Sequence, residues 1–131
     1  MDSKTINKLI EAATEQINTC GNGDTSTVGA AALTEDGLIF SSVNFSHFNG
    51  GPCAEVSLFA RLVSEGQKIP VAIVAIGDRN RGVISPCGRC RQIMIDYYPE
   101  IQVVVLDNGE RATIGVHELL PYSYVQAIDG A

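Results

Sequence analysis

The sequence lacks the features that would tie the protein to a membrane, an export route or a nucleic acid. No apolar run approaches the ~20 residues that a membrane-spanning helix needs. The charged, amphipathic N-terminal segment (residues 1–17) has no apolar stretch of the kind found in secretory signals, so we expect a cytoplasmic protein. Acidic residues outnumber basic ones by 15 to 9. Because a protein that binds phosphate backbones usually carries a basic face, this excess argues against DNA or RNA as a partner.

Cysteine occurs only four times, and its spacing is not that of a disulfide scaffold. Cys20 stands alone, whereas Cys53, Cys87 and Cys90 form a set. In a protein without an export signal the thiols are expected to stay reduced, which leaves metal binding or catalysis as the use of the set. We expect Cys20 to be an idle thiol.

The 131 residues are 45% hydrophobic and 18% charged, a balance typical of a globular domain. No repeat or linker marks a boundary, so we expect a single domain over residues 1–131. Hydrophobic periodicity predicts helices over residues 5–17, 53–65 and between Pro86 and Pro99. The same reasoning predicts strands over residues 27–33, 38–45, 71–76 and 101–106. This order favours an α/β fold in which helices cover a mixed sheet.

The cysteine set is arranged to bind a metal ion. Cys53 opens one predicted helix, and Cys87 and Cys90 open another; a helix N-terminus favours the thiolate that a metal requires. Two cysteines spaced C-x-x-C can bind one tetrahedral ion, and the third adds another corner. There is no fourth cysteine at ligand spacing, and neither His47 nor His117 has a spaced partner. We therefore expect one Zn²⁺ per chain with water at the fourth corner, as in catalytic sites.

Glu55 lies two residues after the first of these cysteines. A carboxylate beside a zinc ion can take a proton from water and hand it to a departing amine. Three cysteine ligands with a glutamate that is not a ligand is the arrangement of zinc-dependent base deaminases. The pattern therefore predicts a hydrolytic deaminase in which Glu55 is catalytic.

The motifs that carry this chemistry resemble the cytidine deaminase family over residues 28–124, in the segments NGGPCAE, NRGVISPCGRCRQI and ELLPYSY. Within the family they are most similar to the blasticidin-S deaminase branch. The resemblance implies a three-layer α/β sandwich around a mixed five-stranded sheet. It also implies hydrolysis of the 4-amino group of a free cytosine nucleoside, here blasticidin S or a similar modified nucleoside. A homotetramer with shared active sites is expected on the same ground.

Departures from the family pattern concern the substrate. The family reads Asn-x-Glu in the second strand to anchor the ribose; Asn44 is kept, but Ser46 stands where the Glu belongs. Ser26 matches the aromatic residue that precedes the family's first strand, and Tyr124 matches the aromatic that reaches into a neighbouring subunit's pocket. Because the acid is lost, we expect ordinary cytidine to bind poorly. We expect Arg81 to pair with a carboxylate on the substrate's sugar.

A further departure concerns the metal ligands. Family members use an Arg after C-A-E to hydrogen-bond the zinc-bound sulfurs, and Val56 replaces it here. A donor must then come from elsewhere, and Arg89 is the candidate, with Arg91 as the other possibility. The blasticidin-S branch also has a Trp near the C-terminus, where this chain has Gln126.

Two other functions are compatible with these motifs. One is an ordinary cytidine/deoxycytidine deaminase of pyrimidine salvage with a relaxed ribose pocket. The other is a non-catalytic zinc-binding assembly module. Glu55 discriminates against the second, because a structural zinc site needs no acid two positions after a ligand.

Overall fold

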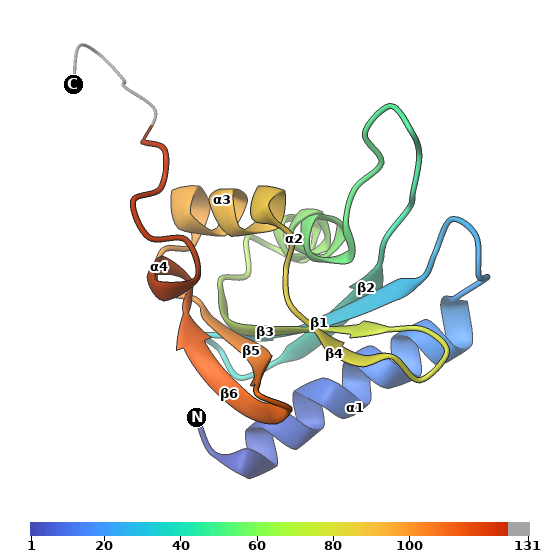
Figure 1. The fold of residues 1–131 in the computed structure, drawn as a ribbon, viewed down its shortest axis with the longest axis horizontal. Coiled ribbons are helices and arrows are strands. Elements are labelled where there is room, and N and C mark those ends of the chain that lie inside the picture. Colours follow the sequence, from blue (N-terminus) through green and yellow to red (C-terminus); the bar gives the residue numbers. More distant parts are fainter. Residues whose placement is uncertain (126–131) are drawn as a thin grey trace.

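The computed structural model describes residues 1–125, in which a mixed sheet lies between two helical layers (Figure 1). The helices are α1 (Ser3–Cys20), α2 (Ala54–Ser64), α3 (Gly88–Tyr97) and α4 (Val116–Leu119). The strands are β1 (Val28–Thr34), β2 (Ile39–Val43), β3 (Pro70–Gly77), β4 (Gly82–Ile84), β5 (Gln102–Asp107) and β6 (Glu110–Gly115). Gln126, where the blasticidin-S branch has a Trp, lies outside the described residues.

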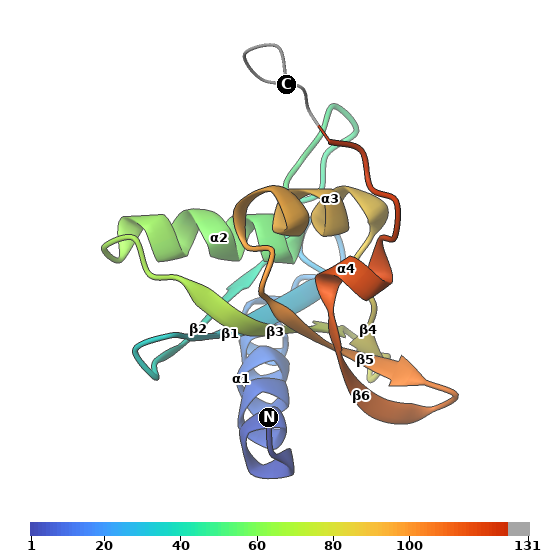
Figure 2. The ribbon, with the colours of Figure 1, turned by 90° about the vertical axis from the view of Figure 1, so that its left-hand side faces the viewer.

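The sheet has six strands, one more than the family resemblance implied: five follow the order β2-β1-β3-β5-β6, and β4 pairs with β3 beside this path. The β3–β5 pairing is parallel and the other pairings are antiparallel. Helix α1 covers one face of the sheet, and α2 and α3 cover the other (Figures 1 and 2). The predicted three-layer α/β sandwich with a mixed sheet is therefore confirmed. The sequence patterns missed β4 and β6, so residues 1–125 contain six strands in all.

Helix α1 is longer than the predicted 5–17 because both of its ends are capped. At the N-terminus the Thr5 amide donates to the Asp2 carboxylate over 2.8 Å, and at the C-terminus the Gly21 amide donates to the Ile17 carbonyl over 2.8 Å. Its buried stripe is Leu9, Ala13 and Ile17. In the part of the chain that the structure describes, no helix is long and apolar enough to cross a membrane.

Strand β1 packs against both helical layers at once. Ala30 and Ala32 belong to the core under α2 and α3, whereas Ala31 belongs to the core under α1. All three alanines are fully buried. At Gly29 the α1 backbone comes so close that an added Cβ would lie 2.6 Å from the Ala13 carbonyl oxygen. The small residues of β1 thus set how closely α1 docks on the sheet.

We expect Gly29→Ala to lower the free energy of unfolding by about 1–3 kcal/mol, because its methyl group forces α1 away from the sheet. Gly115→Ala is the matched control, since a Cβ there meets only the Gln102 Nε2 atom at 3.4 Å in an ordinary extended conformation. Urea denaturation followed by circular dichroism measures both. Equal stabilities for Gly29→Ala and the wild-type protein would contradict this packing of α1.

Candidate metal centre and active site

The N-termini of α2 and α3 present the cysteine set. Cys53 and Cys87 are the N-cap residues of these helices, both with extended backbones, and neither side chain makes a capping hydrogen bond. Cys90 lies in the first turn of α3 and is fully buried. Both sulfurs at the caps are therefore free to face a ligand at helix ends whose unpaired amides favour negative charge.

The three sulfurs lie close enough together to share one ion. All of them are within 4.8 Å of one another, and this is the one such cluster of His, Cys, Asp and Glu side chains found within residues 1–125. A tetrahedral zinc ion at about 2.3 Å from each sulfur holds the sulfurs about 3.8 Å apart. The Sγ atoms of Cys53 and Cys87 lie 3.7 Å apart. The donor set and its spacing fit zinc.

The surroundings act on the three thiols in different ways. Burial raises the pKa of the Cys53 thiol. Burial, together with the neighbouring Glu55 carboxylate, also raises the pKa of the Cys90 thiol. At Cys87 burial is outweighed by hydrogen bonds from the backbone amides of Cys90 and Arg89 and from the neighbouring thiols, so its pKa is lowered. Three thiolates this close together repel one another, so they require a cation between them. A metal ion bound there would also hold the thiols deprotonated.

Glu55 lies in the first turn of α2 and is only 5% exposed. Burial raises the pKa of its carboxyl group, and none of the ion pairs among residues 1–125 involves it. A carboxylate with a raised pKa is a stronger base and can hold a proton between two transfers. Glu55 shares with two of the metal ligands, Cys53 and Cys87, a pocket of about 160 Å³, lined by Val28, Asn44, Cys53, Ala54, Glu55, Ile84, Ser85 and Cys87.

Two of the predicted substrate residues lie near this pocket but already have protein partners. The Asn44 side-chain oxygen accepts hydrogen bonds from the amides of Thr27 and Val28, at 2.8 and 3.0 Å. Asn44 thus ties the end of β2 to the start of β1 while lining the pocket. Ser26 is buried and donates to the Asn44 carbonyl over 2.8 Å. It does not line the pocket, and substrate contact by either residue stays a prediction.

The structure places Arg81 and Tyr124 outside the pocket lining. The Arg81 guanidinium donates to the Asp78 carboxylate at 3.0 Å and to the Thr27 carbonyl at 2.9 Å. These bonds hold the turn between β3 and β4 against the start of β1. The Tyr124 side chain is exposed, and its carbonyl accepts a hydrogen bond from Gln92. The predicted substrate contacts of Arg81 and Tyr124 stay predictions.

Among residues 1–125, no side-chain hydrogen bond joins Arg89 or Arg91, the arginines expected to support the sulfurs, to a cysteine. Arg89 is exposed, and no side-chain hydrogen bond joins it to residues 1–125. Arg91 donates instead to the carbonyls of Pro86 and Leu119. Besides the neighbouring thiols, the backbone amides of Cys90 and Arg89 lower the pKa of the Cys87 thiol. Support of the sulfurs by the Arg89 side chain stays a prediction.

Four lining residues were not predicted as site residues from the sequence: Ala54, which lies between Cys53 and Glu55, and Val28, Ile84 and Ser85. Ile84 ends the unpredicted β4, and Ser85 follows it directly. The signal that could have found these two is position, because they immediately precede Pro86 and the ligand Cys87. Val28 opens β1 at the same end of the sheet, and only the strand order brings it there.

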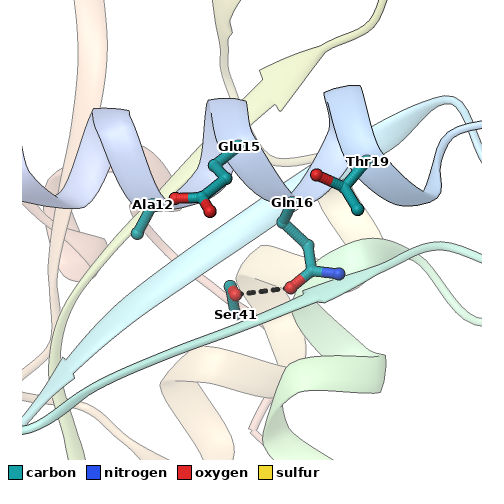
Figure 3. A pocket seen from close by; sticks show the side chains of 5 residues that line it. All are labelled: Ala12, Glu15, Gln16, Thr19 and Ser41. Atoms are coloured by element: carbon teal, nitrogen blue, oxygen red, sulfur yellow. Dashed lines mark hydrogen bonds between the residues drawn. The ribbon is translucent and has the colours of Figure 1, made fainter.

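A larger pocket of about 260 Å³ lies on the opposite side of the sheet, between α1 and β2 (Figure 3). It is lined by Ala12, Glu15, Gln16, Thr19 and Ser41. The Ser41 hydroxyl donates to the Gln16 side-chain oxygen over 2.6 Å (Figure 3). Glu15 is its one ionisable lining group, and none of the cysteine set lies there. Its larger volume alone therefore does not identify this pocket as the reactive site.

Comparison with known proteins decides the family. Residues 3–118 match the family model described as the cytidine and deoxycytidylate deaminase zinc-binding region. The chain belongs to this family. It is 36% identical over 128 residues to the blasticidin-S deaminase of Bacillus cereus, covering 91% of each chain. It is 39% identical over 101 residues to a cytidine deaminase of Halalkalibacterium halodurans, covering 74% of this chain and 76% of that one.

Solved structures of cytidine deaminases share the fold. That from Burkholderia pseudomallei has a TM-score of 0.75 at 30% identity, over 95% of this chain and 100% of the other. The structure from Mycobacterium tuberculosis has a TM-score of 0.75 at 26% identity, and the match covers 92% of this chain and 98% of that one. The family membership and the cysteine cluster confirm three predictions: the cytidine deaminase resemblance, the zinc cofactor and the enzyme class. The protein is a zinc-dependent hydrolytic deaminase.

We expect purified protein to hold one zinc ion per chain and Cys87→Ser to lose most of it, because an alcohol is a far poorer zinc ligand than a thiolate. Cys20→Ser is the control, since Cys20 is exposed at the end of α1 and outside the cluster. Elemental analysis after dialysis measures the zinc content. A full equivalent of zinc in Cys87→Ser would show that the ion lies elsewhere.

Proposed function

We propose that the protein removes the 4-amino group of a free cytosine nucleoside by hydrolysis and releases ammonia. The observation that carries this proposal is the buried Glu55 carboxyl group, which shares a small pocket with the cysteine cluster. Sites that enclose drug-sized ligands have volumes of ~300–1,000 Å³, so a pocket of about 160 Å³ suits the base alone. The sugar would lie at its rim.

Glu55 carries the protons of this reaction. When bound, zinc supplies a Lewis acid that makes water a nucleophile near neutral pH. The Glu55 carboxylate takes a proton from that water and delivers it to N3 of the base as oxygen adds to C4. It then transfers the proton of the new hydroxyl group to the amine, which leaves as ammonia. Burial of Glu55 suits this task, because a raised pKa lets it hold the proton between steps.

A free nucleoside fits the protein better than a nucleic acid does. The net charge of −6 provides no general attraction for a phosphate backbone. We further propose that the whole chain acts as one domain, in the cytoplasm, as a homotetramer with shared active sites. The exposed Tyr124, 71% accessible and outside its own pocket, supports the shared site because its ring is available to a neighbouring subunit.

We expect Glu55→Gln to keep its zinc and its fold but to lose nearly all turnover. General acid–base catalysis contributes ~10²–10⁴-fold, and here one group serves several transfers, so the loss should reach the upper end or exceed it. Glu65→Gln is the matched control, because Glu65 caps the other end of the same helix and is exposed. Ammonia release at saturating nucleoside measures both. A Glu55→Gln protein with a third of the wild-type rate would require another proton carrier.

Within this class we propose blasticidin S or a similar modified nucleoside as the preferred substrate. The similarity to the Bacillus cereus blasticidin-S deaminase extends over 91% of the chain. Ser46 is exposed, and its amide donates to the Thr25 carbonyl over 2.8 Å, so no carboxylate occupies the position that anchors a ribose in the family. The exposed Arg89, beside the ligands, or Arg81 could meet a carboxylate on a modified sugar.

The alternative substrate is ordinary cytidine or deoxycytidine. It is favoured by the similarity to the Halalkalibacterium halodurans cytidine deaminase, which at 39% identity is limited to 74% of this chain. The choice between the two turns on Ser46. A hydrogen bond to a charged group contributes ~1.5–3 kcal/mol, so the missing acid should cost cytidine roughly ten- to a hundred-fold in kcat/KM.

We therefore expect wild-type protein to prefer blasticidin S, and Ser46→Glu to shift the preference toward cytidine. Ser46→Gln is the control, because it adds the same bulk without the charge. The ultraviolet change on deamination gives kcat/KM for cytidine, deoxycytidine and blasticidin S with each protein. Efficient turnover of cytidine by the wild-type protein, with blasticidin S ignored, would refute the branch assignment and leave the zinc chemistry in place.

A further inference from the structure

The side chain of Arg91 turns back along its own helix toward the metal ligands. Arg91 is the fourth residue of α3, one position after Cys90. It is half-buried, and its Nε atom donates to the Pro86 carbonyl oxygen over 2.9 Å. Its Nη1 atom donates to the Leu119 carbonyl oxygen, at the end of α4, over 2.8 Å. One guanidinium group thus joins the turn before α3 to a second helix.

Arg91 holds both peptide groups that flank the ligand Cys87. Its side chain binds the Pro86 carbonyl, which belongs to the peptide group before Cys87. Its backbone amide donates to the Cys87 carbonyl over 3.0 Å, which belongs to the peptide group after it. The orientation of these two groups sets the direction in which the Cys87 side chain leaves the main chain. No other residue described here bonds both of them.

Both carbonyls that the guanidinium binds need a donor. Pro86 is buried, so solvent is hindered from reaching its carbonyl. The Leu119 carbonyl lies in the last turn of α4, where a helix leaves its carbonyls without internal partners. Arginine suits this position because its planar group presents several N–H donors in fixed directions. A lysine keeps the positive charge but has no planar group that presents its donors in fixed directions.

We propose that Arg91 is a positioning residue of the metal centre, which fixes Cys87 for zinc by clamping the Pro86 carbonyl to the end of α4. This role differs from hydrogen bonding to the sulfurs, since Arg91 donates to carbonyls instead. It also explains how the ligand turn is held in a chain with Val56 at the position after Glu55. The proposal rests on the zinc centre and not on the identity of the nucleoside, so failure of the substrate assignment leaves it intact.

The test compares Arg91→Gln, Arg91→Lys and the control Arg61→Gln, which removes an arginine that also donates to a backbone carbonyl, that of Ser41, but in the last turn of α2 and away from the cysteines. Zinc affinity is measured by competition with a chromophoric chelator, on protein shown to be folded by circular dichroism. Cobalt(II) is then substituted for zinc, because the intensity and position of its absorption bands report the geometry of the thiolate ligands. Urea denaturation of each variant measures global stability separately.

We expect both Arg91 variants to bind zinc about 10–100-fold more weakly, the usual cost of losing a residue that orients a metal ligand. Their cobalt spectra should shift, while Arg61→Gln matches the wild-type protein in both measurements. If Arg91→Gln does not fold, Arg91→Lys decides the matter. Wild-type zinc affinity and an unchanged cobalt spectrum in Arg91→Lys would overturn the proposal. So would a loss of stability alone, or an equal loss of zinc affinity in Arg61→Gln.

Discussion

The close approach of three cysteine sulfurs is the constraint on which the rest of this site depends. Sulfurs within 4.8 Å of one another cannot all be thiolates without a cation between them, because their mutual repulsion in a partly buried setting is too large. The protein reduces this repulsion with the backbone N–H groups at the helix N-termini. Two helices begin at the cluster, where their unpaired amides favour negative charge, and the backbone amides of Cys90 and Arg89 lower the pKa of Cys87. Zinc supplies the remaining charge.

The order of the helices and strands along the chain brings the three cysteines and Glu55 together. Helices α2 and α3 lie on the same face of the sheet, with their first residues at the cluster (Figure 2). Because Glu55 follows Cys53 on one helix, a single rigid element carries both a ligand and the proton carrier. The same helix buries that carboxyl group in the wall of the pocket, where desolvation raises its pKa. Ligation and proton transfer are therefore fixed by one packing arrangement.

The parts of the structure that the sequence predicted are those with a local signal. Helical periodicity marked α1 and α2, uninterrupted apolar runs marked β3 and β5, and the cysteine spacing marked the metal centre with Glu55 beside it. Strands β4 and β6 were missed because β4 has only three residues and β6, which reads ERATIG, shows no regular alternation of polar and apolar residues. The neighbours of Asn44, Ser26 and Arg81 could not be predicted, because their partners lie many residues away. Arg81, for example, bonds the carbonyl of Thr27.

The central claim is that this pocket adds water to a cytosine ring and expels its amine. The most direct measurement offers cytidine and blasticidin S to zinc-loaded protein in water labelled with heavy oxygen. Released ammonia is counted, and the nucleoside product is weighed by mass spectrometry. The account predicts one ammonia for each nucleoside converted and solvent oxygen in place of the 4-amino group. Fully zinc-loaded protein that releases no ammonia from either nucleoside, or a product without solvent oxygen, would contradict it.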